Sequence, residues 1–168
     1  TSLSLNGATL TGSYGQLSVQ ADGSFVYALT QSVPALQALN VGQSLTEVFS
    51  YELTDSSGQT SVALLTITIA GANDAPVATS MPAVTLTAGS PIPPVALPPF
   101  ADVDDAVLTY SASLPGGGPL PGWLSFDPAT RSFTGTPPTG SPGTIMVTVT
   151  GTDGSLSDQV SIALVIGD

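Results

Sequence analysis

Apolar and polar residues alternate with a period of two along most of this 168-residue chain, as in G-Q-L-S-V-Q at residues 15–20. Successive side chains of a β-strand point to opposite faces of a sheet, so this pattern is typical of strands with one buried and one wet face. The helical period is nearly absent, and residues 33–39 are the one stretch that suits a short helical turn. We therefore expect an all-β fold.

Glycine and proline turns divide the alternating runs into short strands. Asp22-Gly23 is a favoured pair for a hairpin turn between residues 15–20 and 24–29. Residues 55–59 join two longer runs, and the prolines of residues 91–100 suit an edge or irregular strand, because proline cannot donate to a sheet ladder. Short strands at regular spacing with such turns predict antiparallel β-sandwiches.

The two halves of the chain end in the same order of features. Residues 51–71 and 148–167 both read as a strand, Thr-Asp, a Gly/Ser turn, an apolar strand and a glycine. A chain of this length also suits two domains of about 80 to 90 residues each. We expect two tandem antiparallel β-sandwiches, residues 1–75 and 76–168, with the boundary near Pro76.

Charge and composition exclude several classes of function. Lysine, histidine and cysteine are absent, and Arg131 stands against twelve acids for a net charge of -11. Nucleic acids and anionic membranes are therefore poor partners, no apolar run reaches the roughly 18 residues of a membrane span, and disulfides are impossible. Catalysis lacks an obvious base or nucleophile, so we expect no enzyme. The acids repel one another unless metal cations, or protons at low pH, neutralise them.

Two sets of motifs carry family resemblances. Residues 12–29, 33–39 and the closing G-A-N-D-A-P-V (71–77) resemble the VCBS-type repeat of large bacterial surface proteins. Residues 100–114 and L-P-G-W-L-S-F-D-P-A-T-R-S-F-T-G-T-P (120–137) resemble the dystroglycan-type cadherin-like domain, also described as an Ig domain. Between them the resemblances cover nearly the whole chain, and both imply Ig/cadherin-like β-sandwiches.

The resemblances also imply a biological setting. Proteins built from such modules are long bacterial adhesins of the RTX kind, secreted by a type I route to the cell surface. Their modules extend or present other domains in cell adhesion and biofilm formation, and calcium sits at the junctions. The expected partners are therefore calcium and the neighbouring domains of the same chain, and the segment is expected to be a monomer that does not insert into a membrane.

Oxygen-bearing side chains from separate parts of the sequence are expected to meet at the junction. Asn73 and Asp74 follow the last strand of the first half, while A-D-V-D-D (101–105) and G-T-D-G-S (151–155) lie in loops of the second half that face the same end. Calcium takes roughly six to eight oxygen ligands. We therefore predict one calcium ion, with ligands drawn from Glu47, Asn73, Asp74, Asp102, Asp104 and Asp153.

Each of these residues also has an ordinary explanation. Asn-Asp before Ala-Pro is a common turn sequence, and Asp153 stands in a common hairpin tip. A solvated glutamate accounts for Glu47 equally well, and Asp105 is either an outer partner of the metal or solvated. These alternatives remain open at the level of sequence.

A calcium-dependent binding module for carbohydrate or peptide is the alternative function. Trp123 and Tyr110 would form an aromatic platform for a sugar, although burial in the core is the favoured interpretation of Trp123 in L-P-G-W-L-S-F. The Gly/Pro-rich loop at residues 113–122 is a second candidate binding element, and a plain spacer is its simpler interpretation.

Overall fold

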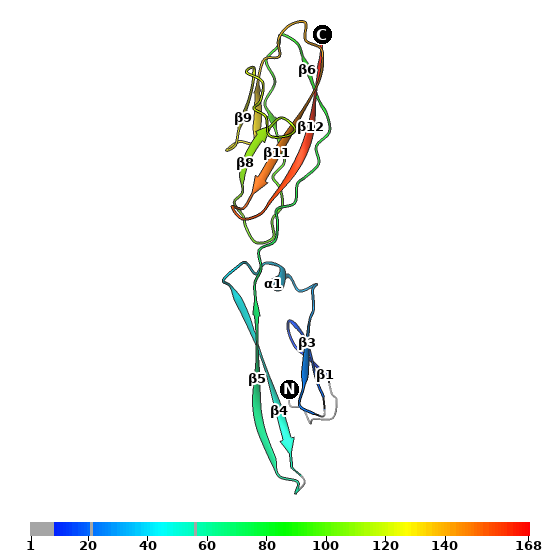
Figure 1. The fold of residues 1–168 in the computed structure, drawn as a ribbon, viewed down its shortest axis with the longest axis vertical. Coiled ribbons are helices and arrows are strands. Elements are labelled where there is room, and N and C mark those ends of the chain that lie inside the picture. The colour runs from blue at the N-terminus through cyan, green and yellow to red at the C-terminus, as the bar shows by residue number, and fades with distance from the viewer. Residues whose placement is uncertain (1–8, 21, 56) are drawn as a thin grey trace. The chain divides into compact units, whose positions relative to one another are not determined.

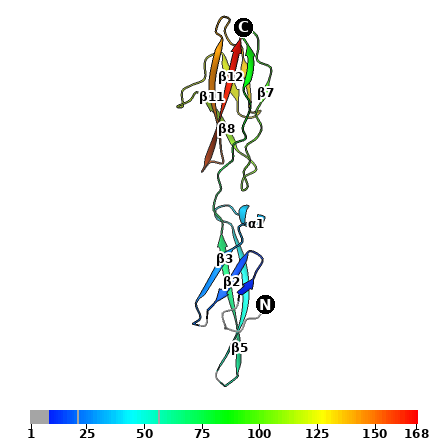
Figure 2. The same cartoon turned by 90° about the vertical axis from the view of Figure 1, so that its right-hand side faces the viewer.

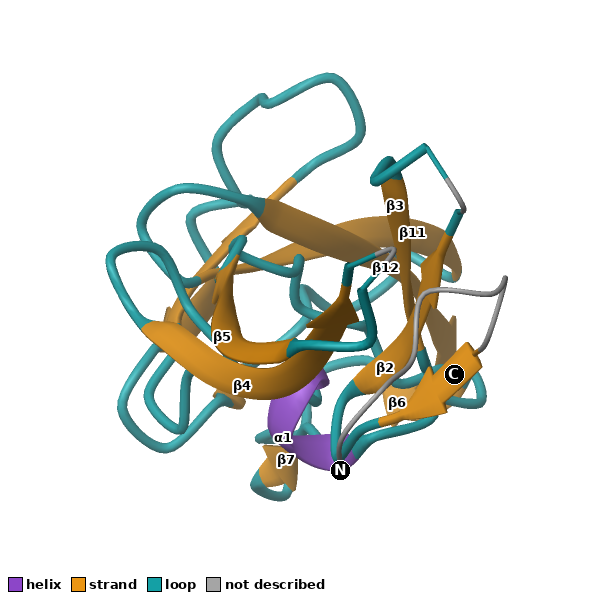
Figure 3. Cartoon of the chain, turned by 90° about the horizontal axis from the view of Figure 1, so that it is seen from below, coloured by secondary structure: helices purple, strands orange, loops and turns teal. Residues whose placement is uncertain are grey.

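The computed structural model describes residues 9–20, 22–55 and 57–168, and these are almost entirely β-structure (Figure 1). The chain divides into two compact units, Thr1–Asn73 and Asp74–Asp168. Figure 3 shows the strands in orange and the single short helix of the described residues in purple. The prediction of an all-β fold is confirmed. No helix in the described ranges has the length and apolar character needed to cross a membrane.

The first unit consists of a three-stranded sheet and a long hairpin. The sheet has the order β1-β2-β3 and is antiparallel, and the hairpin pairs β4 with β5 over eleven residues each. Its elements are β1 (Thr9–Thr11), β2 (Gly15–Val19), β3 (Phe25–Leu29), α1 (Pro34–Gln37), β4 (Ser44–Thr54) and β5 (Thr60–Ala70). The helical turn lies where the sequence predicts it.

Local turn chemistry explains the β2–β3 hairpin. Gly23 adopts φ 86°, which a residue without a side chain reaches easily. The Oδ1 atom of Asp22 accepts the N–H of Ser24 at 2.9 Å and its hydroxyl at 2.7 Å. The predicted hairpin at Asp22-Gly23 is confirmed, while the N-terminal residues 1–8 and single positions 21 and 56 lie outside the described residues.

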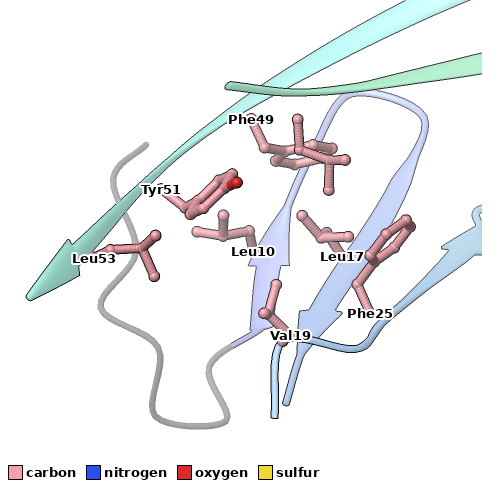
Figure 4. Close-up of a pocket in the computed structure, with 9 residues that line it drawn as sticks. Leu10, Leu17, Val19, Phe25, Phe49, Tyr51 and Leu53 are labelled. Atoms are coloured by element: carbon pink, nitrogen blue, oxygen red, sulfur yellow. The ribbon is translucent and has the colours of Figure 1, made fainter. Parts of the chain in front are cut away.

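The inward-facing apolar side chains of the alternating strands form the core of the first unit. Its buried cluster is small, with Leu10, Leu17, Val19 and Phe49 at its centre. A cavity of about 270 Å³ opens beside these side chains and is also lined by Phe25, Tyr51 and Leu53 (Figure 4). The core of this unit is therefore incompletely filled by the residues that the structure describes.

The second unit is a sandwich of two sheets (Figure 2). One sheet has the order β6-β12-β11-β8 and the other β7-β10-β9. The strands are β6 (Val84–Thr87), β7 (Val95–Ala96), β8 (Thr109–Ser113), β9 (Leu124–Asp127), β10 (Ser132–Gly135), β11 (Gly143–Thr152) and β12 (Ser157–Gly167). Inward side chains from both sheets, among them Phe133 and Val147 at 1% and 0% exposure, fill the core.

One strand pair departs from the antiparallel prediction. β6 pairs with β12 in parallel, with Val84 opposite Leu164 and Thr87 opposite Gly167. The direction of pairing is not encoded in a period of two, because a strand alternates in the same way whichever direction its neighbour runs. β7, in the proline-rich stretch, lies at the edge of its sheet as predicted.

Candidate functional site

The loop at residues 101–105 is anchored at its start. Ala101 forms an antiparallel bridge with Val77, with N···O distances of 2.7 and 3.0 Å. The buried Phe100 donates its N–H to the hydroxyl oxygen of Tyr110 at 3.0 Å. The bridge brings the first residues of the second unit beside the acidic loop, although about 25 residues of chain separate them.

Asp102 and Asp104 each use only one carboxylate oxygen in this loop. Asp102 Oδ1 accepts the N–H groups of Asp104 and Asp105, both at 2.9 Å. Asp104 Oδ2 accepts the N–H of Asp74 at 2.6 Å. Asp102 Oδ2 and Asp104 Oδ1 are buried and have no hydrogen-bond partner among the described residues. A buried carboxylate oxygen without a partner is costly, so these two atoms require an explanation.

The segment that enters the second unit is held at several points. Asp74 donates its backbone N–H to Asp104, and the side chain of Pro76 is almost fully buried. The N–H of Ala78 donates to Asp158 Oδ2 at 2.8 Å, and this bond lowers the pKa of the Asp158 carboxyl below its ordinary value. Asp74 and the residues after it are therefore built into the second unit.

Asp153 serves the turn between β11 and β12. Its Oδ1 atom accepts the N–H groups of Ser155 at 2.6 Å and Leu156 at 2.7 Å. Across the described ranges, no three His, Cys, Asp or Glu side chains gather closely enough to hold a metal. The structure thus brings Asp102, Asp104 and the backbone of Asp74 together, and it does not bring together the full predicted set.

Glu47 lies inside the first unit, where it is 9% exposed. Its Oε1 atom accepts the N–H of Ser13, and its Oε2 atom accepts the hydroxyl of Tyr27 at 2.5 Å. Burial, and then the hydrogen bond to Glu47, raises the pKa of the Tyr27 hydroxyl. A side chain at Gly12 would overlap the Glu47 carboxylate. Because both oxygens have donors within the unit, we leave Glu47 out of the metal set proposed below.

The aromatic residues suggested as a sugar platform are part of the core. Tyr110 is 8% exposed, and its ring packs edge-on against Phe100 with centroids 5.5 Å apart. Trp123 is half-buried and packs on the same core. Leu120, in the Gly/Pro-rich loop, also packs there. The core interpretation of Trp123 is therefore the one that the structure supports.

Sequence reasoning missed a second feature of this unit. A cavity of about 290 Å³ is lined by Asp105, Tyr110 and Arg131, together with apolar residues. Arg131 is the single basic residue of the chain, and this rarity was the signal that could have drawn attention to it.

Comparison with protein families finds a match in each half of the chain. Residues 75–167 match the family described as Putative Ig domain, and residues 1–71 match the family described as Bacterial cadherin-like domain. No curated protein matches the chain.

Solved structures support the same fold. Mouse Cadherin-23 EC22-24 matches 95% of this chain and 51% of its own length at 16% identity, with a TM-score of 0.54. Human CDH23 EC21-23 matches 90% of this chain and 51% of its own length at 19% identity, with a TM-score of 0.53. The chain thus spans about half the length of these structures, and at such identities the likeness concerns the fold alone.

Proposed function

The chain belongs to the Putative Ig domain family through residues 75–167, and on that premise we propose that it is a calcium-stiffened extender segment of a bacterial surface adhesin. Cadherin-like and Ig domains are typically extracellular and non-enzymatic, which suits an adhesin-type module. In this role the segment is a monomer that spaces neighbouring domains of one long polypeptide during cell adhesion and biofilm formation.

The two unpartnered oxygens of Asp102 and Asp104 carry the proposal. Calcium is a hard cation that takes carboxylate, amide, carbonyl and water oxygens. Asp102 Oδ2 and Asp104 Oδ1 are buried carboxylate oxygens, so a bound cation would supply the partner that each lacks. Asp74 and Asn73 would contribute further oxygens, because the N–H of Asp74 already bonds to Asp104. A pair of carboxylates completed by neutral oxygens fits calcium better than it fits zinc, which prefers nitrogen and sulfur ligands.

Connectivity explains how such a cation would act on the junction. Asn73 is the last residue of the first unit and Asp74 is the first of the second. A cation held by Asp104 and its neighbours would restrain the peptide that joins the units, while Pro76 restricts the backbone just after it. Without a cation, the carboxylates repel one another and the joint is more mobile.

The calcium concentration around the chain would decide whether the site is filled. Extracellular calcium modules bind at roughly 0.1–1 mM, so the site would fill outside the cell and stay empty in cytosol. Calcium at about 100 times its Kd would stabilise the folded state by about 2.7 kcal/mol. The chain would be pliable during export and stiffer at the cell surface.

Thermal unfolding in EDTA, calcium and magnesium tests the proposal. We expect calcium, and not magnesium, to raise the Tm of the second unit by several degrees, and we expect Asp102→Ala to abolish the rise. Asp127→Asn is the matched control, because Asp127 Oδ1 and Oδ2 have donors from Ala129 and Thr130 in a turn. A calcium response that persists in Asp102→Ala, or that disappears in Asp127→Asn, would contradict the assignment.

Ligand binding remains the second candidate function. The observation that favours it is the cavity beside Arg131, whose lining residue Asp105 follows the proposed calcium ligand Asp104 in the chain.

A further inference from the structure

Arg131 stands at a position whose backbone favours glycine. It is the last residue of the turn between β9 and β10, with φ 51°, and it is the one non-glycine residue of the described chain with a positive φ. Side chains reach this left-handed region only at a cost, and such outliers gather at functional sites. The strained backbone at this position therefore suggests that the side chain of Arg131 has a specific role.

The side chain of Arg131 is held from two directions. Its Nε atom donates to the carbonyl of Leu97 at 3.4 Å, and its Cζ atom lies 5.6 Å from the centre of the Tyr110 ring. Tyr110 is itself fixed, because its hydroxyl oxygen accepts the N–H of Phe100. A carbonyl and a ring face orient the guanidinium, but neither neutralises its charge. The two terminal nitrogens remain the donors suited to paired hydrogen bonds with a carboxylate.

The cavity beside Arg131 has the composition of a small polar site. Its volume is about 290 Å³, and its wall combines Arg131 and Asp105 with apolar side chains that include Pro99, Val107 and Pro128. Small-molecule sites start at about 300 Å³, so this cavity suits one ring rather than a long oligomer. A cation, an acceptor and an apolar wall together fit a ring that carries a carboxylate, hydroxyl groups and C–H faces.

We propose that this cavity binds a carboxylate-bearing sugar residue, such as one uronate unit of an acidic polysaccharide. Arg131 pairs with the sugar carboxylate, Asp105 accepts sugar hydroxyl groups, and the apolar wall packs against the ring. The rest of the chain is strongly acidic, so the long-range field does not favour an anion. Binding therefore depends on the local ion pair between Arg131 and the sugar carboxylate, and the cavity holds one sugar residue.

A nuclear magnetic resonance titration uses the fact that the chain has one arginine. Its side-chain Nε–H signal is unambiguous and reports directly on the site. Galacturonate and galactose are the matched probes, because they differ in the carboxylate at one carbon. In calcium-containing buffer we expect galacturonate to shift the Arg131 signal to saturation and to bind roughly tenfold or more tightly than galactose.

Two variants separate recognition from folding. Arg131→Gly suits the left-handed backbone, so we expect a folded protein with binding weakened roughly tenfold or more, followed through the backbone amides of the cavity. Asp105→Asn removes the negatively charged acceptor of the sugar hydroxyl groups, so sugar binding should weaken. A carboxylate ligand without hydroxyl groups should bind no worse, because the neighbouring negative charge is gone.

The outcomes decide the proposal. Saturable, carboxylate-dependent binding that Arg131→Gly removes supports it. No response to galacturonate, or equal affinity for galactose, overturns it. If N-acetylglutamate binds as tightly as galacturonate and Asp105→Asn raises the affinity for both, the cavity binds a peptide carboxylate and the assignment to sugar is wrong.

Discussion

Each unit buries carboxylate oxygens, and the two units treat them differently. In the first unit, Glu47 receives a donor on each oxygen, from Ser13 and Tyr27. In the second, Asp102 and Asp104 each keep one buried oxygen without a hydrogen-bond partner in the described chain. The first arrangement is complete with protein groups alone. The second arrangement leaves two buried oxygens without such partners in the described chain, and the proposed calcium ion would supply them.

The largest expected effect comes from removing the Glu47 carboxylate, which has a donor on each oxygen. Glu47→Ala leaves the part-buried N–H of Ser13 and hydroxyl of Tyr27 without an acceptor, and we expect the first unit to lose roughly 2–4 kcal/mol of unfolding free energy. Denaturant unfolding measures the loss. Glu52→Ala, in the same strand, is the control and should cost far less. Equal losses in the two variants would show that the hydrogen bonds of Glu47 contribute little.

A smaller effect of opposite sign is expected in the incomplete arrangement. Asp104→Asn removes one of the two negative charges, so we expect the second unit to gain about 1 kcal/mol in EDTA through reduced repulsion. The same variant should lose most of its calcium response. Unfolding curves in EDTA and in calcium give both quantities. A variant that is less stable in EDTA and still responds to calcium would remove the distinction between the two sites.

The smallest expected effect is the pH dependence of the stability of the first unit, which arises from Tyr27. The folded-state pKa of Tyr27 is raised above its ordinary value of 10.0, by burial first and then by Glu47. A raised pKa contributes stability that is fully present below pH 10 and is lost as pH rises toward the folded value. We therefore expect the first unit to weaken above pH 10 by less than the two preceding effects, and Tyr27→Phe to weaken less steeply. Circular dichroism melts across this range measure it, and parallel curves would contradict it.

Much of the fold could be predicted because period two and turn chemistry are local properties. The β2–β3 hairpin at Asp22-Gly23 and the helical turn at Pro34–Gln37 follow from a few neighbouring residues. The parallel pairing of β6 with β12 could not be predicted, since alternation says nothing about the direction of a neighbouring strand.

The candidate site was only partly accessible to sequence reasoning. Asp102 and Asp104 are two residues apart in one loop, so their proximity could be read directly. Glu47 has the same inward parity as Phe49 and Tyr51, a signal of burial that our expectation of a metal-bound or solvated glutamate overlooked. Its donors lie 34 and 20 residues away in sequence, so only the folded structure reveals them. The cavity at Arg131 likewise joins segments that pattern alone does not connect.

The parallel pairing of β6 and β12 has a mechanical consequence. β6 is the first strand of the second unit and β12 is the last, and they pair over four residues, from Val84 with Leu164 to Thr87 with Gly167. Tension applied to the two ends of this unit pulls neighbouring parallel strands in opposite directions along their length. The hydrogen bonds between them are then loaded together in shear, whereas a hairpin pulled from its open end breaks them one after another. Under such tension this pair would share the load with the bonds that hold Val77 and Ala78, which precede β6 in the chain.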